Sequence, residues 1–125
     1  MGTDIYIELE QRVNNLWKPL EIDAALMPDD RYYNVFNFLS DLKLVNEGIF
    51  TNRGIPFDTS VNINKLGDYG HTYAYVDEIL AAPWKENGLE DCYFFAFFKH
   101  ILPRLVPCDF FEDQRNIRAV WGFDN

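Results

Sequence analysis

The first part of the chain alternates between apolar and polar residues. The alternation runs from Asp4 to Arg12, and its apolar face consists of Ile5, Ile7 and Leu9. A period of two predicts a strand with one face on the core. Asn14-Asn15 is a turn signal, and the residues from Leu16 to Ile22 can return as a second strand. Pro19 has no backbone N–H, so we expect the second strand of this N-terminal hairpin at a sheet edge or with a bulge.

Two helices are predicted from apolar residues at helical spacing. Asp29 or Asp30 can cap the first helix, which continues to about Lys43. The second is short and runs from Asp77 to Ala82. Pro83 stops it, because the residue before a proline is pushed out of the helical conformation.

The stretch from Leu89 to about Leu102 predicts the most hydrophobic helix. Its aromatic side chains surround most of the helix, and they are Tyr93, Phe94, Phe95, Phe97 and Phe98. A helix that is apolar on all sides is buried, so we expect this one at the centre of the core. Pro103 ends or kinks it, because proline lacks the amide donor and clashes with the preceding turn.

The remaining segments predict a long loop and two more strands. The stretch from Asn46 to Lys65 is rich in turn residues, and we expect an ordered loop with little regular structure, which in a compact domain is often functional. His71 to Tyr75 is a short strand candidate. Ile117 to Phe123 alternates as a last strand, with Arg118 on the face opposite to Trp121.

These elements together predict an α+β fold in a single domain over residues 1–125. We expect a small antiparallel or mixed sheet, made of the N-terminal hairpin plus the C-terminal strand, packed against helices that cover one face. One of these helices is the buried aromatic-rich one. The length of 125 residues fits one domain. Aromatic residues make up 17% of the chain, and we interpret them mainly as core, with a ligand or partner surface as the alternative.

The net charge and the cysteines restrict the functions and compartments that we expect for this chain. The formal net charge is −9, which repels phosphate backbones, so we expect no binding to nucleic acid. The same charge permits a basic partner or imitation of nucleic acid, and solubility alone is the simplest reason for it. The two cysteines, Cys92 and Cys108, form no paired motif, which favours a reducing, cytoplasmic compartment. The longest apolar stretch is too short to span a bilayer, and we expect no membrane contact.

Motifs of catalysis are missing from the sequence. No HExxH, paired-cysteine, G-x-S-x-G or phosphate-loop pattern occurs, and no cofactor is expected. A composite metal site remains the alternative, formed in space by Asp4, Glu8, Asp68 and His71. We favour the simpler interpretation, in which these are solvated carboxylates and a turn aspartate.

Three arginines adjoin turns or element ends in this acidic chain. They are Arg31, Arg53 and Arg118. Arginines gathered in one cleft can hold a phosphate or a carboxylate through bidentate contacts. Internal ion pairs with some of the 20 acidic residues are the alternative.

Several short segments resemble a known family. The opening Met1-Gly2-Thr3-Asp4-Ile5-Tyr6 resembles an M-G-x-D-I-H start, and the ending Ile117–Asn125 resembles V-R-x-V-F-W-F-D-N. Between them, Arg31–Phe36, Arg53–Pro56 and Gly70–Thr72 resemble R-N-Y-x-L-F, R-G-L-P and G-H-S in the same order. Over nearly its whole length the chain is therefore similar to a family of small proteins encoded by bacteriophages and prophages.

The resemblance implies a viral origin and the cytoplasm of the host cell as the setting, and it implies no particular activity. Tyr6 stands where the family has histidine, which puts in doubt a metal site that depends on that histidine. The polar residues of the matching segments are candidates for one ligand site: Arg31, Tyr33, Arg53, His71, Arg118 and Asp124, together with Asp4. The alternative is a buried hydrogen-bond network that holds loops to the sheet.

The resulting hypothesis is a phage accessory binding protein that counters host defence. It would sequester a small anionic, nucleotide-like ligand, on which Tyr33 or Trp121 stacks, or bind a host protein with its acidic face. A small metal-dependent hydrolase with the composite Asp/Glu/His site is the alternative from another class. The sequence leaves homo-oligomer formation open.

Overall fold

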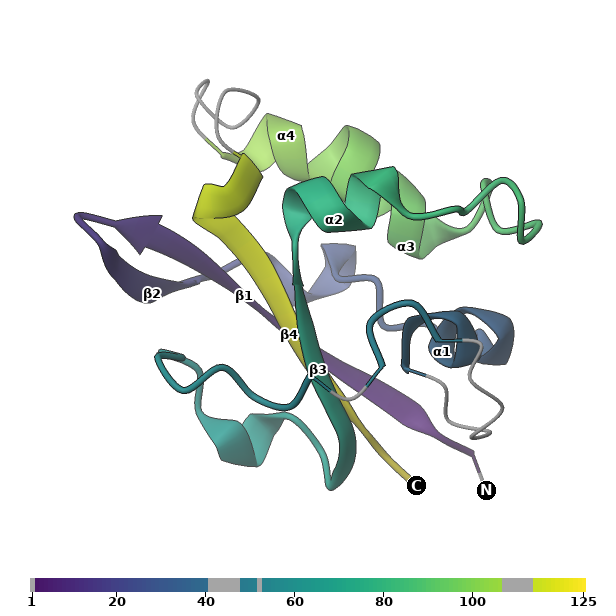
Figure 1. Ribbon diagram of the computed structural model, residues 1–125, viewed down its shortest axis with the longest axis horizontal. Coiled ribbons are helices and arrows are strands. Elements are labelled where there is room, and N and C mark those ends of the chain that lie inside the picture. The colour runs from purple at the N-terminus through teal and green to yellow at the C-terminus, as the bar shows by residue number, and fades with distance from the viewer. Residues whose placement is uncertain (1, 41–47, 52, 107–113) are drawn as a thin grey trace.

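The computed structural model describes residues 2–40, 48–51, 53–106 and 114–125. Within this part of the chain, four strands form one antiparallel sheet in the order β2-β1-β4-β3 (Figure 1). They are β1 (Asp4–Val13), β2 (Leu16–Leu20), β3 (Tyr69–Tyr75) and β4 (Ile117–Asp124). The predicted α+β class is confirmed, and the sheet is antiparallel rather than mixed. The first and last strands of the chain lie side by side at its centre.

The N-terminal hairpin has the predicted two-residue turn. Asn14 and Asn15 both have positive φ, at 53° and 66°, as a type I′ turn requires. Such a turn makes Val13 and Leu16 a hydrogen-bonded pair, and bonded and non-bonded pairs then alternate along the ladder. Pro19 therefore falls at a non-bonded position of the edge strand β2, where an N–H would point away from β1. The expectation of Pro19 at a sheet edge is confirmed.

Helices pack against one face of the sheet. They are α1 (Tyr33–Ser40), α2 (Val76–Ala81), α3 (Tyr93–Ala96), the π-helical segment η3 (Phe97–Ile101) and α4 (Leu102–Leu105). Figure 1 shows α2, α3 and α4 close together and α1 apart from them. The core between the layers joins Ile5, Ile7 and Leu9 of β1 and the odd-numbered face of β4 to the buried aromatics of the helices, as predicted.

The aromatic-rich helix is present but differs from the prediction at both ends. It begins at Tyr93, because Leu89–Cys92 forms a turn instead. It also continues past Pro103 to Leu105. The helix is π-helical from Phe97 to Ile101, and Pro103 lies in the first turn of α4, directly after this segment.

Two further helix predictions change in detail. Lys99 and His100 are exposed, so the aromatic helix is buried along one side rather than all round. The first helix begins at Tyr33, later than a cap at Asp29 or Asp30 implies, and the end predicted near Lys43 lies outside the described residues. The short helix before Pro83 is confirmed as α2.

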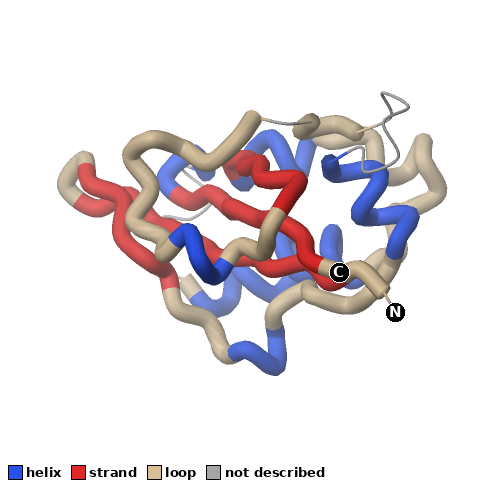
Figure 2. The backbone as a smooth tube through the Cα atoms, turned by 90° about the horizontal axis from the view of Figure 1, so that it is seen from below, coloured by secondary structure: helices blue, strands red, loops and turns tan. Residues whose placement is uncertain are grey.

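The predicted long loop covers the other face of the sheet from Ile55 on, whereas Phe50 near its start belongs to the core on the helix-covered face. In its described part it contains one short 3-10 turn, η2 (Ile63–Lys65), and Figure 2 shows it on the near side of the strands. Val61 and Leu66 pack on Val120 of β4 to form a second, smaller core. The loop approaches the sheet so closely that a Cβ on Gly122 would collide with the carbonyl oxygen of Leu66. Within the described residues, no helix is long and apolar enough to cross a membrane.

Candidate functional site

Arg118 lies at the centre of a buried polar network. It stands opposite Glu10 in the β1–β4 register, and its Nε donates to Glu10 Oε1 at 2.9 Å. The side chains are 2% and 0% exposed. A second guanidinium nitrogen donates to Asp58 Oδ1 at 3.0 Å. Burial alone would lower the pKa of Arg118. The hydrogen bonds that Arg118 donates to Glu10 and Asp58, and the charges of these two acids, outweigh burial, so the pKa lies above its usual value.

The same network fastens the long loop to the sheet. Glu10 Oε2 accepts hydrogen bonds from the backbone N–H of Ser60 at 2.6 Å and from its hydroxyl at 2.7 Å. The hydroxyl of Thr59 donates to the other carboxylate oxygen at 3.0 Å. The Arg118 guanidinium also lies 3.9 Å from the ring centroid of Trp17 on β2, close enough for a cation–π contact. The guanidinium group of Arg118 is therefore in contact with two carboxylates and an aromatic ring of the protein itself.

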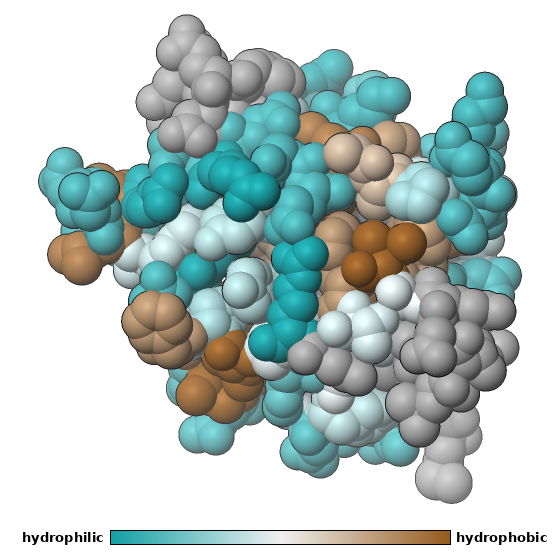
Figure 3. All heavy atoms as spheres, in the orientation of Figure 1, coloured by the Kyte–Doolittle hydropathy of each residue, from teal (hydrophilic) through white to brown (hydrophobic). Residues whose placement is uncertain are grey.

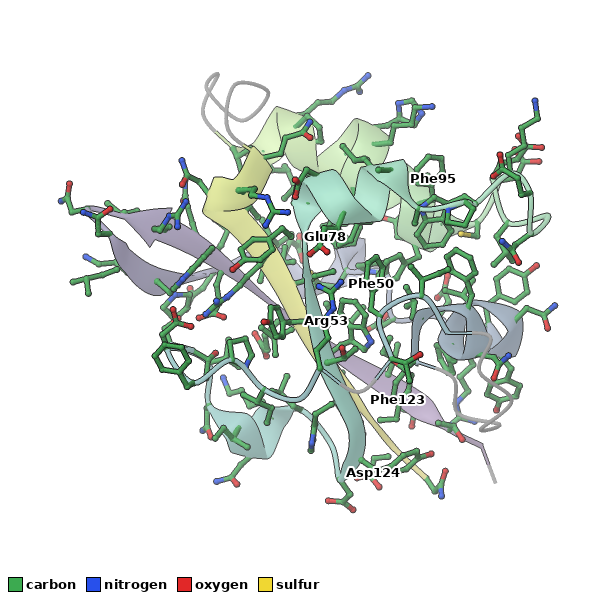
Figure 4. The ribbon with its side chains drawn as sticks, viewed as in Figure 1. Phe50, Arg53, Glu78, Phe95, Phe123 and Asp124 are labelled. Carbon is green, nitrogen blue, oxygen red and sulfur yellow. The ribbon has the colours of Figure 1, made fainter. Side chains whose placement is uncertain are left out.

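Arg53 is held in a comparable way. Its two terminal nitrogens donate to the two carboxylate oxygens of Glu78 on α2 at 2.8 and 2.7 Å, and Figure 4 shows the two side chains directed toward one another. The hydrogen bond from Arg53 lowers the pKa of Glu78 and raises that of Arg53. Tyr73 lies between this arginine and Arg118, with its ring centroid 5.7 and 5.9 Å from them. The structure thus brings Arg53 and Arg118 to one aromatic ring, each already paired with an acid.

Arg31 belongs to a different part of the molecule. It donates to both oxygens of Asp4 at 2.6 and 3.2 Å, at the start of β1, and this hydrogen bond lowers the pKa of Asp4. The partners of Arg31 and Arg118, Asp4 and Glu10, are six positions apart on one strand, which corresponds to about 20 Å. The structure therefore does not bring Arg31 and Arg118 to one small ligand.

The other candidate ligand residues are divided in the same way. Tyr33 lies near Arg31, and its hydroxyl accepts from the backbone N–H of Thr3 at 3.3 Å. Asp124 is the cross-strand partner of Asp4, so it also lies at this end of the sheet. Trp121 is buried on the helix-covered face, where its Nε1 donates to Ser40 Oγ at 2.8 Å, and so it is not placed to stack on a ligand beside Arg118.

His71 takes part in loop packing. Its Nε2 lies 2.9 Å from the carbonyl oxygen of Gly67, and its ring lies beside Gly122. Among the residues that the structure describes, no three His, Cys, Asp or Glu side chains are grouped so that they could hold a metal ion. The composite metal site of Asp4, Glu8, Asp68 and His71 is therefore not assembled. Of the three candidate arginines, Arg53 and Arg118 fit the alternative interpretation, in which a polar network holds a loop to the sheet.

A groove that the sequence did not indicate runs along the first half of β1. β2 pairs with β1 only from Leu9 to Val13, so within the described ranges residues 4–8 have no neighbouring strand on that side. The groove has a volume of about 500 Å³. One side is formed by β1 itself, and the other by residues from the segment 20–29 and by Lys65. We predicted that the second strand extends to Ile22, whereas β2 ends at Leu20. Because β2 is shorter than β1, the first half of β1 is left uncovered and borders the groove.

The rim of this groove is acidic. Among the described residues that line it, the carboxylates belong to Asp4, Glu8, Glu21 and Asp29, and the one cation is Lys65. Asp4 is neutralised by Arg31, whereas the other three acids have no ion pair within the described ranges. Hydrophilic residues also dominate the face seen in Figure 3, where apolar atoms form small separate patches. In the described part of the chain, the candidate arginines are thus paired internally, while three carboxylates at the groove have no ion pair.

Comparisons with protein-family models, with curated proteins and with solved structures found no match to this chain.

Proposed function

We propose that this protein is a bacteriophage accessory protein that binds a basic segment of a host protein with its acidic surface, and that it acts without catalysing a reaction. The observation that carries the proposal is the unequal pairing of charges. Arg31, Arg53 and Arg118 all bind carboxylates of the chain itself, while Glu8, Glu21 and Asp29 at the groove have no ion pair with any residue that the structure describes. A cationic partner gains from such a surface without breaking internal contacts.

The same pairing argues against the small anionic ligand. A phosphate or carboxylate that approached Arg118 would have to displace Glu10 and Asp58, and at Arg53 it would have to displace Glu78. Its own charge would also be repelled by a net charge of −9. Each displacement leaves a carboxylate without its partner, and for Glu10 that carboxylate is buried, which is costly.

The phage setting rests on the sequence resemblance at the two chain ends and in between. In that setting a protein of this kind would occupy a basic surface of a host component, such as a defence protein, in the cytoplasm. An acidic surface suits this role, because basic surfaces that normally bind nucleic acid are attracted to it over distances of about a Debye length, roughly 8–10 Å.

Fluorescence anisotropy with labelled peptide pools tests the proposal. A Lys/Arg-rich pool and an Asp/Glu-rich pool of the same length are titrated with the protein at low and at high salt, and melting curves are recorded with a panel of nucleotides. We expect binding of the basic pool that weakens with salt, and no change in melting temperature with nucleotides. Stabilisation by a nucleotide without binding of the basic pool would overturn the proposal.

A further inference from the structure

The open part of β1 carries backbone groups that have no partner. Leu9 is hydrogen-bonded to Leu20 of β2, so by the alternation along an antiparallel strand the odd-numbered residues turn their N–H and C=O groups toward the β2 side. Ile5 and Ile7 lie beyond the end of β2 on that side. No hydrogen bond from outside the sheet reaches their backbone in the described structure. Four backbone groups, the N–H and C=O of Ile5 and Ile7, therefore lie along the groove without a hydrogen-bond partner among the described residues.

We propose that this edge accepts an extended basic peptide as a fifth strand, in the position that β2 would occupy if it continued past Leu20. The inference rests on the proposed function and names its binding site. Strand addition satisfies the free N–H and C=O groups of Ile5 and Ile7, which gives affinity independent of side chains. The open stretch, residues 4–8, spans about 17 Å and matches a short strand.

The walls of the groove specify the side chains of such a peptide. Peptide residues that lie beside Tyr6 and Glu8 project to the loop-covered side of the sheet. At these peptide positions the charge of Glu8 favours Lys or Arg. Residues that lie beside Ile5 and Ile7 project to the other side, toward the segment that includes Met27. The expected ligand alternates basic and apolar residues. Glu21 and Asp29 add negative charge along the wall.

The other sheet edges of the described structure are not equally open. Pro19 removes the outward N–H from the middle of the β2 edge. The β3 edge is covered in part, since Gly54 donates its N–H to the carbonyl of His71 and Arg53 donates its N–H to the Thr72 hydroxyl. The first half of β1 is the edge that combines free backbone groups with a groove.

A second copy of this chain fits the edge poorly. Two copies that paired through this edge would bring the acids of their two grooves, Glu8, Glu21 and Asp29, toward one another, and like charges close together are destabilising. A cationic peptide has the opposite effect. The charge of the groove therefore selects a basic partner over self-association.

The test uses the peptide acetyl-Lys-Val-Lys-Val-Lys-Val-Lys-amide and two relatives. One relative has the same residues in scrambled order, and the other carries N-methyl groups on the three valines, which remove one edge of backbone donors. Affinity is measured by fluorescence anisotropy, and amide exchange of the whole protein is followed by NMR. We expect the alternating peptide to bind, the N-methylated and scrambled peptides to bind at least about tenfold more weakly, and the Ile5 and Ile7 amides to gain protection.

Charge reversal provides matched protein variants. Glu8→Lys, Glu21→Lys and Asp29→Lys are combined in one variant, and Glu86→Lys, Glu90→Lys and Asp91→Lys in a control with the same change of net charge at an exposed surface away from the groove. We expect the groove variant to weaken binding of the alternating peptide by about tenfold and the control variant to weaken it much less.

The possible outcomes distinguish a failure of the strand-addition site from a failure of the proposed function. If the basic peptides bind but Ile5 and Ile7 gain no protection, or both triple variants lose affinity equally, the strand-addition site is wrong while binding of basic partners stands. If no basic peptide binds, both proposals are wrong. Protection of the Ile5 and Ile7 amides without peptide, together with a dimer in light scattering, would replace the peptide by a second copy.

Discussion

The guanidinium group of Arg118 and the carboxylate of Glu10 face each other across the two central strands, 2.9 Å apart and closed off from solvent. These residues are 108 positions apart in the sequence. Asp58, Thr59 and Ser60 join them from the loop, so one buried pair anchors a long irregular segment to the sheet. One of the arginines that were candidates for a ligand site is thus a structural link between loop and sheet.

Replacement of Arg118 by methionine should destabilise the fold strongly. Arg118→Met leaves the Glu10 carboxylate buried without its counter-charge, and the loss of one partner of a buried pair costs about 3–5 kcal/mol. Urea unfolding at neutral pH, followed by tryptophan fluorescence, measures the change. Arg115→Met removes an exposed cation that pairs with Asp77 and should cost less than about 1 kcal/mol. Equal losses in the two variants would contradict the role assigned to Arg118.

Gly122→Ala should displace the loop from the sheet. The added methyl group would collide with the backbone carbonyl of Leu66, and such overpacking costs about 1–3 kcal/mol. Limited proteolysis should then cut the native protein faster between residues 53 and 66. Gly88→Ala is the control, since nothing lies within 4 Å of the added atom and its cost comes only from the positive φ of 70°. Faster cleavage of that loop in the control would rule out the steric explanation.

The ion pair of Arg53 and Glu78 should make the free energy of unfolding depend on pH. The pKa of Glu78 is lowered in the folded protein by its hydrogen bond from Arg53. Its contribution is therefore complete above the ordinary glutamate pKa of about 4.3 and is lost as the pH falls through the lowered value. The difference in unfolding free energy between the natural protein and Glu78→Gln should shrink over this range in chemical unfolding at a series of pH values. A difference that stays constant over this range would contradict the prediction.

Cys92 should react slowly while the protein is folded. Its side chain is 7% exposed, and burial raises the pKa of its thiol, so little thiolate is present at neutral pH. In a Cys108→Ser background, iodoacetamide labelling followed by mass spectrometry should be slow in buffer and fast in urea. Labelling at the same rate in both conditions would show that the thiol is accessible in the native state.

Local patterns were enough to predict the strands and most of the helices. The alternation at Asp4–Arg12 and at Ile117–Phe123 identifies both central strands, because one face of each is buried and the period of a strand is two. The Asn14-Asn15 turn and the edge position of Pro19 follow from backbone geometry that involves only neighbouring residues. The π-helical segment before Pro103 was missed, since the shift of the helix there depends on packing.

The sequence by itself thus determined the class of the fold and the acidic character of the chain, because both depend on residue types and their spacing. Only the tertiary structure decided which acid neutralises each arginine, since Arg53 and Glu78, or Glu10 and Arg118, meet through strand register and loop path. It also decided that β2 ends opposite Leu9 and leaves the start of β1 open. The length of a partner strand is a property of two segments together, and no periodicity within one of them encodes it.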